Sequence, residues 1–127
     1  MQETEFKVTS TETSDHMFWM ALDKLVSSSK VVVDRPKGTH HPRFDEIIYP
    51  LDYGFLDGTS AMDGTGIDVF VGSGATERVN AVICTVDCMK RDSEIKILLG
   101  CDESEMEVVL SFLNQGPMKG ILIRREA

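Results

Sequence analysis

Acidic side chains are concentrated in two short stretches of this chain, and their chemistry suits the binding of a hard cation. Asp63 and Asp68 bound a glycine-rich turn, and Asp92 and Glu94 lie two residues apart further along the chain. Mg²⁺ prefers oxygen ligands and is usually bound through one or two carboxylates together with a substrate's phosphates. Carboxylates that crowd together without a cation raise one another's pKa. The pattern predicts a Mg²⁺ site, with Mn²⁺ as an alternative, unless these acids are simply solvated turn residues.

A second group of residues could hold phosphate. The segment 35–43 is punctuated by prolines and a glycine and carries Arg35, Lys37, His40, His41 and Arg43. A guanidinium group can donate two parallel hydrogen bonds to phosphate oxygens. The adjacent histidines suit metal binding or proton transfer, but on such a loop they are more often merely exposed. Two tyrosines follow at 49 and 53, and both also fit a core position with the hydroxyl at a polar partner.

The hydrophobic pattern predicts the elements that must position these side chains. Alternation within a strand at 67–71 places Asp68 on the face opposite Ile67 and Val69, while Glu94 and Lys96 share a face because they are two residues apart. Two such strands side by side would bring the acids together. We expect residues 1–12 to form a frayed end or a short edge strand. We expect helices at 13–26 and 104–113, and strands at 30–34, 47–49, 53–56, 67–71, 79–86, 94–99 and 120–124.

Composition limits the possible functions. A chain of 127 residues forms one domain, residues 1–127. Its formal charge of −8 disfavours nucleic acid as a partner, and aromatic residues are not interleaved with basic ones as single-stranded nucleic-acid binding requires. No apolar run approaches the length of a membrane span, so no membrane partner is expected. Three cysteines without a C-x-x-C pair indicate reduced thiols in a cytoplasmic protein.

The segment 49–59, Y-P-L-D-Y-G-F-L-D-G-T, and the following D-G-T-G-I-D at 63–68 resemble the signature of a known enzyme family. It is similar to the soluble, single-domain, magnesium-dependent (family I) inorganic pyrophosphatases. The resemblance implies an α+β, mainly β fold: a small closed five-stranded OB-like β-barrel with flanking N- and C-terminal helices. It also implies Mg²⁺-dependent hydrolysis of pyrophosphate to phosphate by a homo-oligomer.

The resemblance assigns roles to particular residues by their position in the motif. Asp63 and Asp68 match catalytic, metal-binding aspartates. Asp92 and Glu94 match two further metal ligands, with Glu94 in place of an aspartate. The residues that would bind the substrate phosphates are Arg43, Tyr53 and Lys96.

Three departures from the family pattern bear on activity. Thr65 stands where the family has the aspartate that accepts a proton from the attacking water, and a general base typically contributes about 10²- to 10⁴-fold in rate. A strand pair that carries a second phosphate-binding arginine is missing between Arg43 and Tyr49. Phe112 and Leu113 stand where the family has a Tyr-Lys pair. We expect a slowed or re-specialised enzyme; the alternative is a catalytically silent phosphate- or nucleotide-binding module that regulates a partner.

Overall fold

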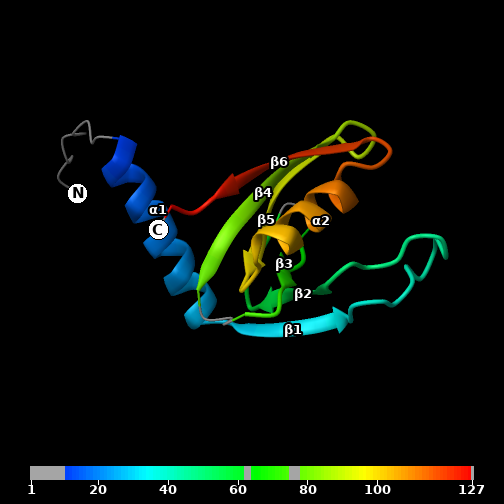
Figure 1. Ribbon diagram of the computed structural model, residues 1–127, viewed down its shortest axis with the longest axis horizontal. Coiled ribbons are helices and arrows are strands. Elements are labelled where there is room, and N and C mark those ends of the chain that lie inside the picture. Colours follow the sequence, from blue (N-terminus) through cyan, green and yellow to red (C-terminus); the bar gives the residue numbers. More distant parts are fainter. Residues whose placement is uncertain (1–10, 62–63, 75–77, 127) are drawn as a thin grey trace.

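The computed structural model describes residues 11–61, 64–74 and 78–126, which form two helices and one six-stranded sheet (Figure 1). The helices are α1 (Thr11–Ser27) and α2 (Glu103–Leu113). Neither is long and apolar enough to cross a membrane. The strands are β1 (Lys30–Arg35), β2 (Asp52–Asp57), β3 (Ile67–Val71), β4 (Val79–Asp87), β5 (Asp92–Leu99) and β6 (Met118–Arg124).

The strand order is β1-β2-β3-β5-β4-β6, so the sheet has two free edges among the described strands. Neighbouring strands are antiparallel except β3 and β5, which are parallel. Figure 1 shows β1 and β6 at opposite ends of the curved sheet. The predicted α+β, mainly β class with helices towards both ends is confirmed. The closed five-stranded barrel is not, because the sheet has six strands and remains open.

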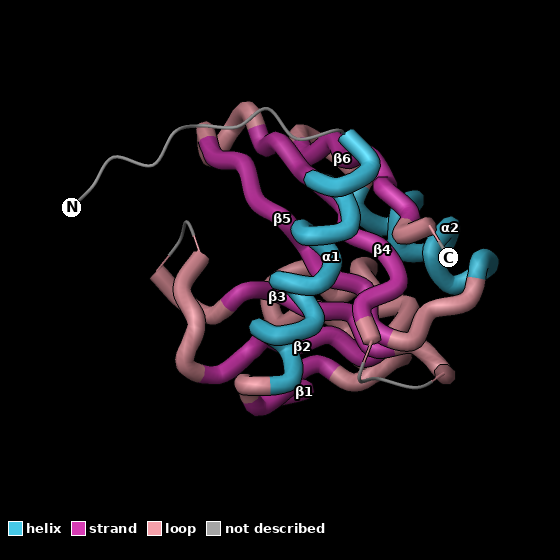
Figure 2. The backbone as a smooth tube through the Cα atoms, turned by 90° about the vertical axis from the view of Figure 1, so that its left-hand side faces the viewer, coloured by secondary structure: helices cyan, strands magenta, loops and turns pink. Residues whose placement is uncertain are grey.

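Each face of the sheet has its own hydrophobic core. Leu98 belongs to the cluster that includes Val109 of α2, whereas its neighbour Ile97 belongs to the cluster that includes Trp19 of α1. Successive side chains of a strand point to opposite faces, which explains this division. Figure 2 shows α1 lying across its face of the sheet. Full burial of one such aliphatic side chain contributes roughly 1.5–3 kcal/mol, so both helices are held mainly by this packing.

The helix α2 begins with a reciprocal cap. The carboxylate of Asp102 accepts a hydrogen bond from the Glu105 backbone N–H at 2.8 Å, and Glu105 Oε1 accepts one from the Asp102 N–H at 2.9 Å. This capping box satisfies two backbone donors that a helix start would otherwise leave without partners. The helix therefore begins one residue before the predicted start at Ser104.

The predicted strand at 47–49 is wrong. These residues lie in the long β1–β2 connection, where the described residues form only an isolated bridge between His40 and Ile48. Two further backbone hydrogen bonds, from His41 to Ile47 at 2.8 Å and from Tyr49 to Thr39 at 3.0 Å, fold the loop back on itself. Pro50 follows directly and has no N–H to continue a ladder. The result is a two-armed loop that extends from the sheet (Figure 1).

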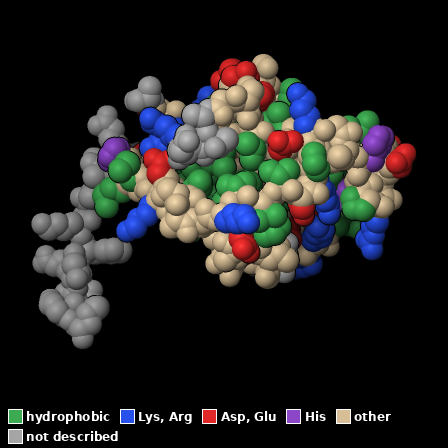
Figure 3. Space-filling model, turned by 90° about the horizontal axis from the view of Figure 1, so that it is seen from below, with side chains coloured by type: hydrophobic (Ala, Val, Ile, Leu, Met, Phe, Trp, Pro, Cys, Tyr) green, Lys and Arg blue, Asp and Glu red, His purple; other side chains and the backbone are tan. Residues whose placement is uncertain are grey.

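Figure 3 views the molecule from below, the side on which Figure 1 places β1. Hydrophobic side chains gather in the middle of this face, with basic and acidic side chains around them. Val33 on β1 is 40% exposed. Apolar side chains contribute a large part of the surface of any folded domain, so this exposure is not by itself a binding site. Of the N-terminal segment 1–12 predicted as a frayed end or edge strand, residues 1–10 lie outside the described residues, and residues 11–12 belong to α1 instead.

Candidate functional site

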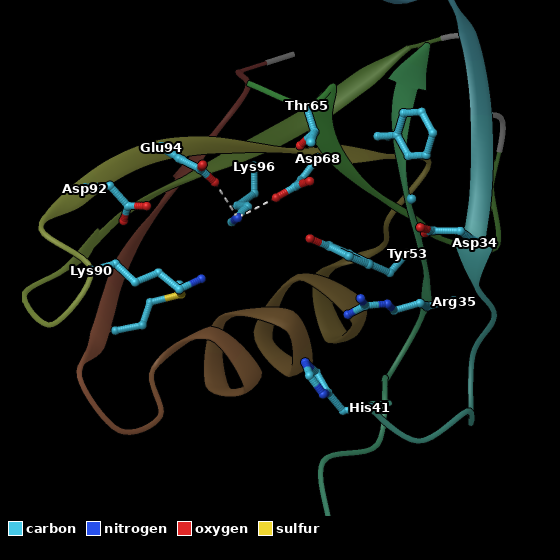
Figure 4. Close-up of a pocket in the computed structure, with 13 residues that line it drawn as sticks. Asp34, Arg35, His41, Tyr53, Thr65, Asp68, Lys90, Asp92, Glu94 and Lys96 are labelled. Carbon is cyan, nitrogen blue, oxygen red and sulfur yellow. Dashed lines mark hydrogen bonds and ion pairs between the residues drawn. The ribbon is translucent and has the colours of Figure 1, made fainter. Parts of the chain in front are cut away.

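A cleft of about 560 Å³ lies against the sheet face that α2 also covers (Figure 4). Its charged lining is mixed and comes mainly from three strands, β1, β3 and β5, and from the β4–β5 turn. Figure 4 shows these side chains pointing toward one another across the cleft. Alongside Gly54, Phe55 and Met118, the lining residues are Asp34, Arg35, His41, Tyr53, Thr65, Asp68, Lys90, Asp92, Glu94 and Lys96.

Strand order brings the central residues of the cleft together. Tyr53 lies on β2, Asp68 on β3 and Lys96 on β5, and these three strands are consecutive in the sheet. Asp68 and Phe70 point to the α2 face because residues two apart in a strand share a face. Lys96 shares that face with Leu98 for the same reason. The alternation predicted for Asp68 and for the Glu94–Lys96 pair therefore agrees with the structure.

Lys96 is the electrostatic centre of the site. Its Nζ lies 2.5 Å from Oδ2 of Asp68 and 2.8 Å from Oε1 of Glu94, and its side chain is only 7% exposed. Burial by itself would lower the pKa of the ammonium group, but the two carboxylates raise that pKa above its ordinary value. Lys96 is therefore charged at neutral pH and neutralises part of the acidic cluster.

Tyr53 lies beside this ion-pair cluster. Burial of its phenol, followed by the negative charge of Asp68, raises the Tyr53 pKa well above its ordinary value. The hydroxyl consequently keeps its proton and is a hydrogen-bond donor at any physiological pH. Figure 4 shows that the hydroxyl points into the cleft toward Asp68 and Lys96. A phenol in this position can donate to an anion that enters the cleft.

Arg35 reaches the cleft because of an irregularity in the β1–β2 pairing. Val33 pairs with Gly54, but the next paired residue of β1 is Arg35, opposite Tyr53, so the register shifts at Asp34. Gly54 permits this arrangement, since a Cβ there would lie 1.8 Å from the carbonyl oxygen of Val32. One extra residue in a strand redirects the side chains around it. Both Asp34 and Arg35 line the cleft as a result.

The guanidinium of Arg35 is held in place by two tyrosines. It donates a hydrogen bond to the hydroxyl of Tyr49 and lies over the rings of Tyr49 and Tyr53, 5.4 Å and 6.0 Å from their centroids. Burial opposes its charge, but the hydrogen bond to Tyr49 contributes to raising the pKa of Arg35. A cation fixed over aromatic faces is pre-organised, so it loses little freedom when it binds an anion.

His41 presents an uncharged ring to the same space. Its Nδ1 accepts hydrogen bonds from the backbone N–H groups of Arg43 at 3.0 Å and Phe44 at 3.3 Å. Desolvation and the positive charges of Arg35, Arg43 and Lys90 lower the pKa of His41. A neutral imidazole whose Nδ1 accepts must carry its proton on Nε2. His41 can therefore donate one hydrogen bond from Nε2.

Asp68 and Glu94 provide carboxylate oxygens of the kind that a divalent cation such as Mg²⁺ requires. Asp68 and Glu94 already share the ammonium group of Lys96, so their oxygens can meet at one positive charge. Mg²⁺ often takes only one or two carboxylates and completes its shell with substrate phosphates and water. The pair fits a Mg²⁺ ion that enters with a phosphate ligand. Within the described residues, no group of three or more His, Cys, Asp and Glu side chains is arranged to hold a metal ion.

Comparison with known proteins relates this architecture to one kind of enzyme. The sequence matches no protein-family model and no curated protein. Among solved structures, an inorganic pyrophosphatase from Neisseria gonorrhoeae is similar, with a TM-score of 0.57 and 18% sequence identity over 75% of this chain and 81% of that chain. The fold is pyrophosphatase-like. At this identity the likeness concerns the fold alone, and one fold can serve several functions.

The structure brings most of the candidate site residues of this pyrophosphatase-like domain together. Tyr53, Asp68, Asp92, Glu94 and Lys96 all line the cleft. Asp63 lies outside the described residues. The remaining substrate-binding candidate, Arg43, is exposed and is not among the residues that line the cleft.

The sequence placed Arg35 in a basic loop that could hold phosphate but did not select it as a substrate-binding residue, and it did not indicate Lys90 at all, although both are cations of the cleft. Arg35 is the last residue of β1 and pairs with Tyr53, whereas the predicted strand ended at 34. Extension of that strand by one residue would have moved Arg35 from the loop to the sheet. Lys90 belongs to the β4–β5 turn, and its approach to the cleft depends on the curvature of that hairpin, which local sequence does not specify.

Proposed function

We propose that this protein is a shortened, divergent inorganic pyrophosphatase that hydrolyses pyrophosphate to phosphate with Mg²⁺. The observation that supports the proposal most is the cluster in which Asp68 and Glu94 share one cation beside Tyr53, in a cleft of a pyrophosphatase-like domain. Titratable groups that crowd together in a cleft are candidates for catalysis. The motif at 49–68 that resembles the pyrophosphatases contributes two of these residues, Tyr53 and Asp68.

The charge balance of the cleft supports a metal-bound substrate. Three cationic side chains, Arg35, Lys90 and Lys96, face four carboxylates among the described lining residues. The slight excess of negative charge in the cleft would repel free pyrophosphate. In a magnesium complex, Mg²⁺ offsets part of the negative charge of pyrophosphate, so the repulsion is weaker. Asp68 and Glu94 would hold Mg²⁺, with Asp92 and Asp63 as further ligands. Once bound, the ion would offset phosphate charge and lower the pKa of a bound water.

The chain's own groups would position the substrate. Lys96 and Arg35 would bind phosphate oxygens, with Arg35 able to donate two parallel hydrogen bonds. Tyr53 would donate through a hydroxyl that stays protonated because its pKa is raised. Fixed donors of this kind stabilise charge that develops on phosphate oxygens without reorganising during the reaction.

Thr65 favours a second candidate function, a catalytically silent module that binds a phosphate or nucleotide and regulates a partner. Its exposed side chain lines the cleft at the motif position where a pyrophosphatase carries its base. A threonine hydroxyl cannot accept a proton from water near neutral pH. Unless another group replaces this base, hydrolysis of pyrophosphate by this protein would be about 10²- to 10⁴-fold slower than hydrolysis by enzymes that have the aspartate.

The deciding experiment measures phosphate release from pyrophosphate by the purified chain, with Mg²⁺, Mn²⁺ or neither. We expect slow, metal-dependent release by the wild type and a gain of at least tenfold in Thr65→Asp. Ser60→Asp is the matched control, because Ser60 is exposed and does not line the cleft, so its activity should equal that of the wild type. If neither the wild type nor Thr65→Asp releases phosphate, the hydrolase is excluded and the binding module is favoured.

A further inference from the structure

A second cavity, of about 380 Å³, adjoins the charged cleft. The two cavities share six lining residues, among them Arg35, Lys90 and Lys96. The two cavities are therefore neighbours, and these cations lie in the walls of both. A ligand whose phosphates bind the cations from the cleft has its remaining part next to the second cavity.

The walls of the second cavity differ in character from those of the first. We name it the aromatic annex, after four of its lining residues: His41, Phe44, Tyr49 and Phe112. The ring centroids of His41 and Tyr49 lie 6.3 Å apart with nearly parallel planes, and those of Tyr49 and Phe112 lie 5.2 Å apart. The ring centroids of Phe44 and His41 lie 5.3 Å apart, and Phe44 is 49% exposed. An exposed aromatic ring next to stacked rings provides a surface for a further flat group.

The annex does not repel an anion at its junction with the cleft. Asp87 is its one acidic residue among those described as lining it, and that residue is 5% exposed. Its Oδ1 accepts hydrogen bonds from the backbone N–H groups of Met89 and Lys90, both at 3.0 Å. The carboxylate is thus engaged in the β4–β5 turn, whereas Arg35 and Lys90 remain available to phosphate oxygens at the junction.

We propose that this site takes a diphosphate that carries a flat aromatic group, such as a nucleoside 5′-diphosphate, with its phosphates in the cleft and its ring in the aromatic annex. The inference rests on the proposed phosphate-binding function of the cleft. Inorganic pyrophosphate has no apolar part and would leave the annex to water. An aromatic ring there removes apolar surface from water and stacks on Phe44 or His41.

The test compares the binding of ADP and of inorganic pyrophosphate to the intact protein by calorimetry in the presence of Mg²⁺. We expect ADP to bind roughly tenfold more tightly than pyrophosphate, the effect of one stacked base. Phe44→Ala should abolish this preference and change pyrophosphate affinity less than about twofold, because Phe44 lies only in the annex. Phe112→Ala should also reduce the preference for ADP over pyrophosphate. Because Phe112 is partly buried, its replacement can lower stability; Phe44 is exposed, so Phe44→Ala tests the same prediction without that effect. Phe18→Ala is the matched control, since Phe18 is a 41%-exposed aromatic residue on α1 and lines neither cavity.

The outcomes separate this inference from the proposed function. Equal affinity for the two ligands, or an equal loss of both in Phe44→Ala, overturns the inference and leaves pyrophosphate hydrolysis standing. Failure of ADP to bind also overturns it. ADP binding that depends on Phe44, without hydrolysis of either ligand, supports the inference and excludes the hydrolase.

Discussion

Nζ of Lys96 lies 2.5 Å from Oδ2 of Asp68, and this contact joins two strands that lie far apart in the sequence. The same nitrogen binds Glu94 at 2.8 Å. The acids that suggested a metal site thus converge on one positive charge, and that charge belongs to the chain itself. Lys96 either positions the acids for a Mg²⁺ ion that arrives with the substrate or competes with that ion for them. Its removal distinguishes the two roles.

Lys96→Met should lower the free energy of unfolding by on the order of 3 kcal/mol, because it leaves two mostly buried carboxylates without their partner. Urea unfolding measures this loss. If Lys96 competes with a metal, Mg²⁺ should raise the melting temperature of Lys96→Met more than that of the wild type, since ligand binding stabilises the folded state. The exposed Lys37→Met is the control and should change neither value. No added Mg²⁺ response in Lys96→Met would contradict competition for these two acids.

Arg35 and Arg43 form a matched pair for the substrate-binding role. Arg35 lines the cleft, whereas Arg43 is exposed and does not. Arg35→Met should lower kcat/KM for pyrophosphate by about 10- to 100-fold, the value of one or two charge-assisted hydrogen bonds. Arg43→Met should stay within about twofold of the wild type. A larger loss of kcat/KM in Arg43→Met than in Arg35→Met would contradict this prediction. It would assign substrate binding to Arg43, as its motif position implies, and not to Arg35.

Gly54 should not tolerate any side chain. A Cβ at this position would lie 1.8 Å from the Val32 carbonyl oxygen, so Gly54→Ala must push β1 away from β2. We expect a loss of about 3 kcal/mol in the free energy of unfolding, at the upper end for overpacking. At Gly74 the nearest atom would lie 3.1 Å away, so Gly74→Ala should cost much less. Similar urea midpoints for the two variants would show that β1 can move away from β2 at little cost in free energy.

Asp23 should make stability depend on pH on the acid side. Arg125 donates to both oxygens of Asp23, at 2.8 Å and 2.9 Å, and this pairing lowers the pKa of Asp23 below its ordinary value of 3.8. A lowered pKa contributes stability that is complete above about pH 3.8 and disappears as the pH falls through the folded-state pKa. Asp23→Asn should therefore cost about 1.5–3 kcal/mol at pH 7 and progressively less below pH 4.

The measurement for Asp23 is urea unfolding of both proteins across a series of pH values. Asp15→Asn serves as the control, because Asp15 is exposed on the same helix. A difference between the wild type and Asp23→Asn that does not change with pH would mean that the pair contributes by packing and not by charge.

The sequence by itself determined which side chains share a face of a strand. Side chains two residues apart in a strand point to the same face, and adjacent side chains point to opposite faces. Asp68 and Val69 therefore lie on opposite faces of their strand, and Glu94 and Lys96 lie on the same face of theirs. Both helices also followed from local pattern, with the start of α2 predicted one residue late because the capping box of Asp102 and Glu105 was not used. These features depend only on neighbours along the chain, which is why they could be predicted.

Only the tertiary structure decided which faces meet. The parallel pairing of β3 with β5 places Asp68 beside Lys96, and that pairing depends on contacts between residues distant in sequence. The same is true of the open sheet, of the loop that replaces the strand at 47–49, and of the shift at Asp34 that turns Arg35 into the cleft. Local periodicity assigns a residue to one face of its strand, but it does not determine which other strand pairs with that strand. The pairing is determined by the packing of the two hydrophobic cores against the curved sheet.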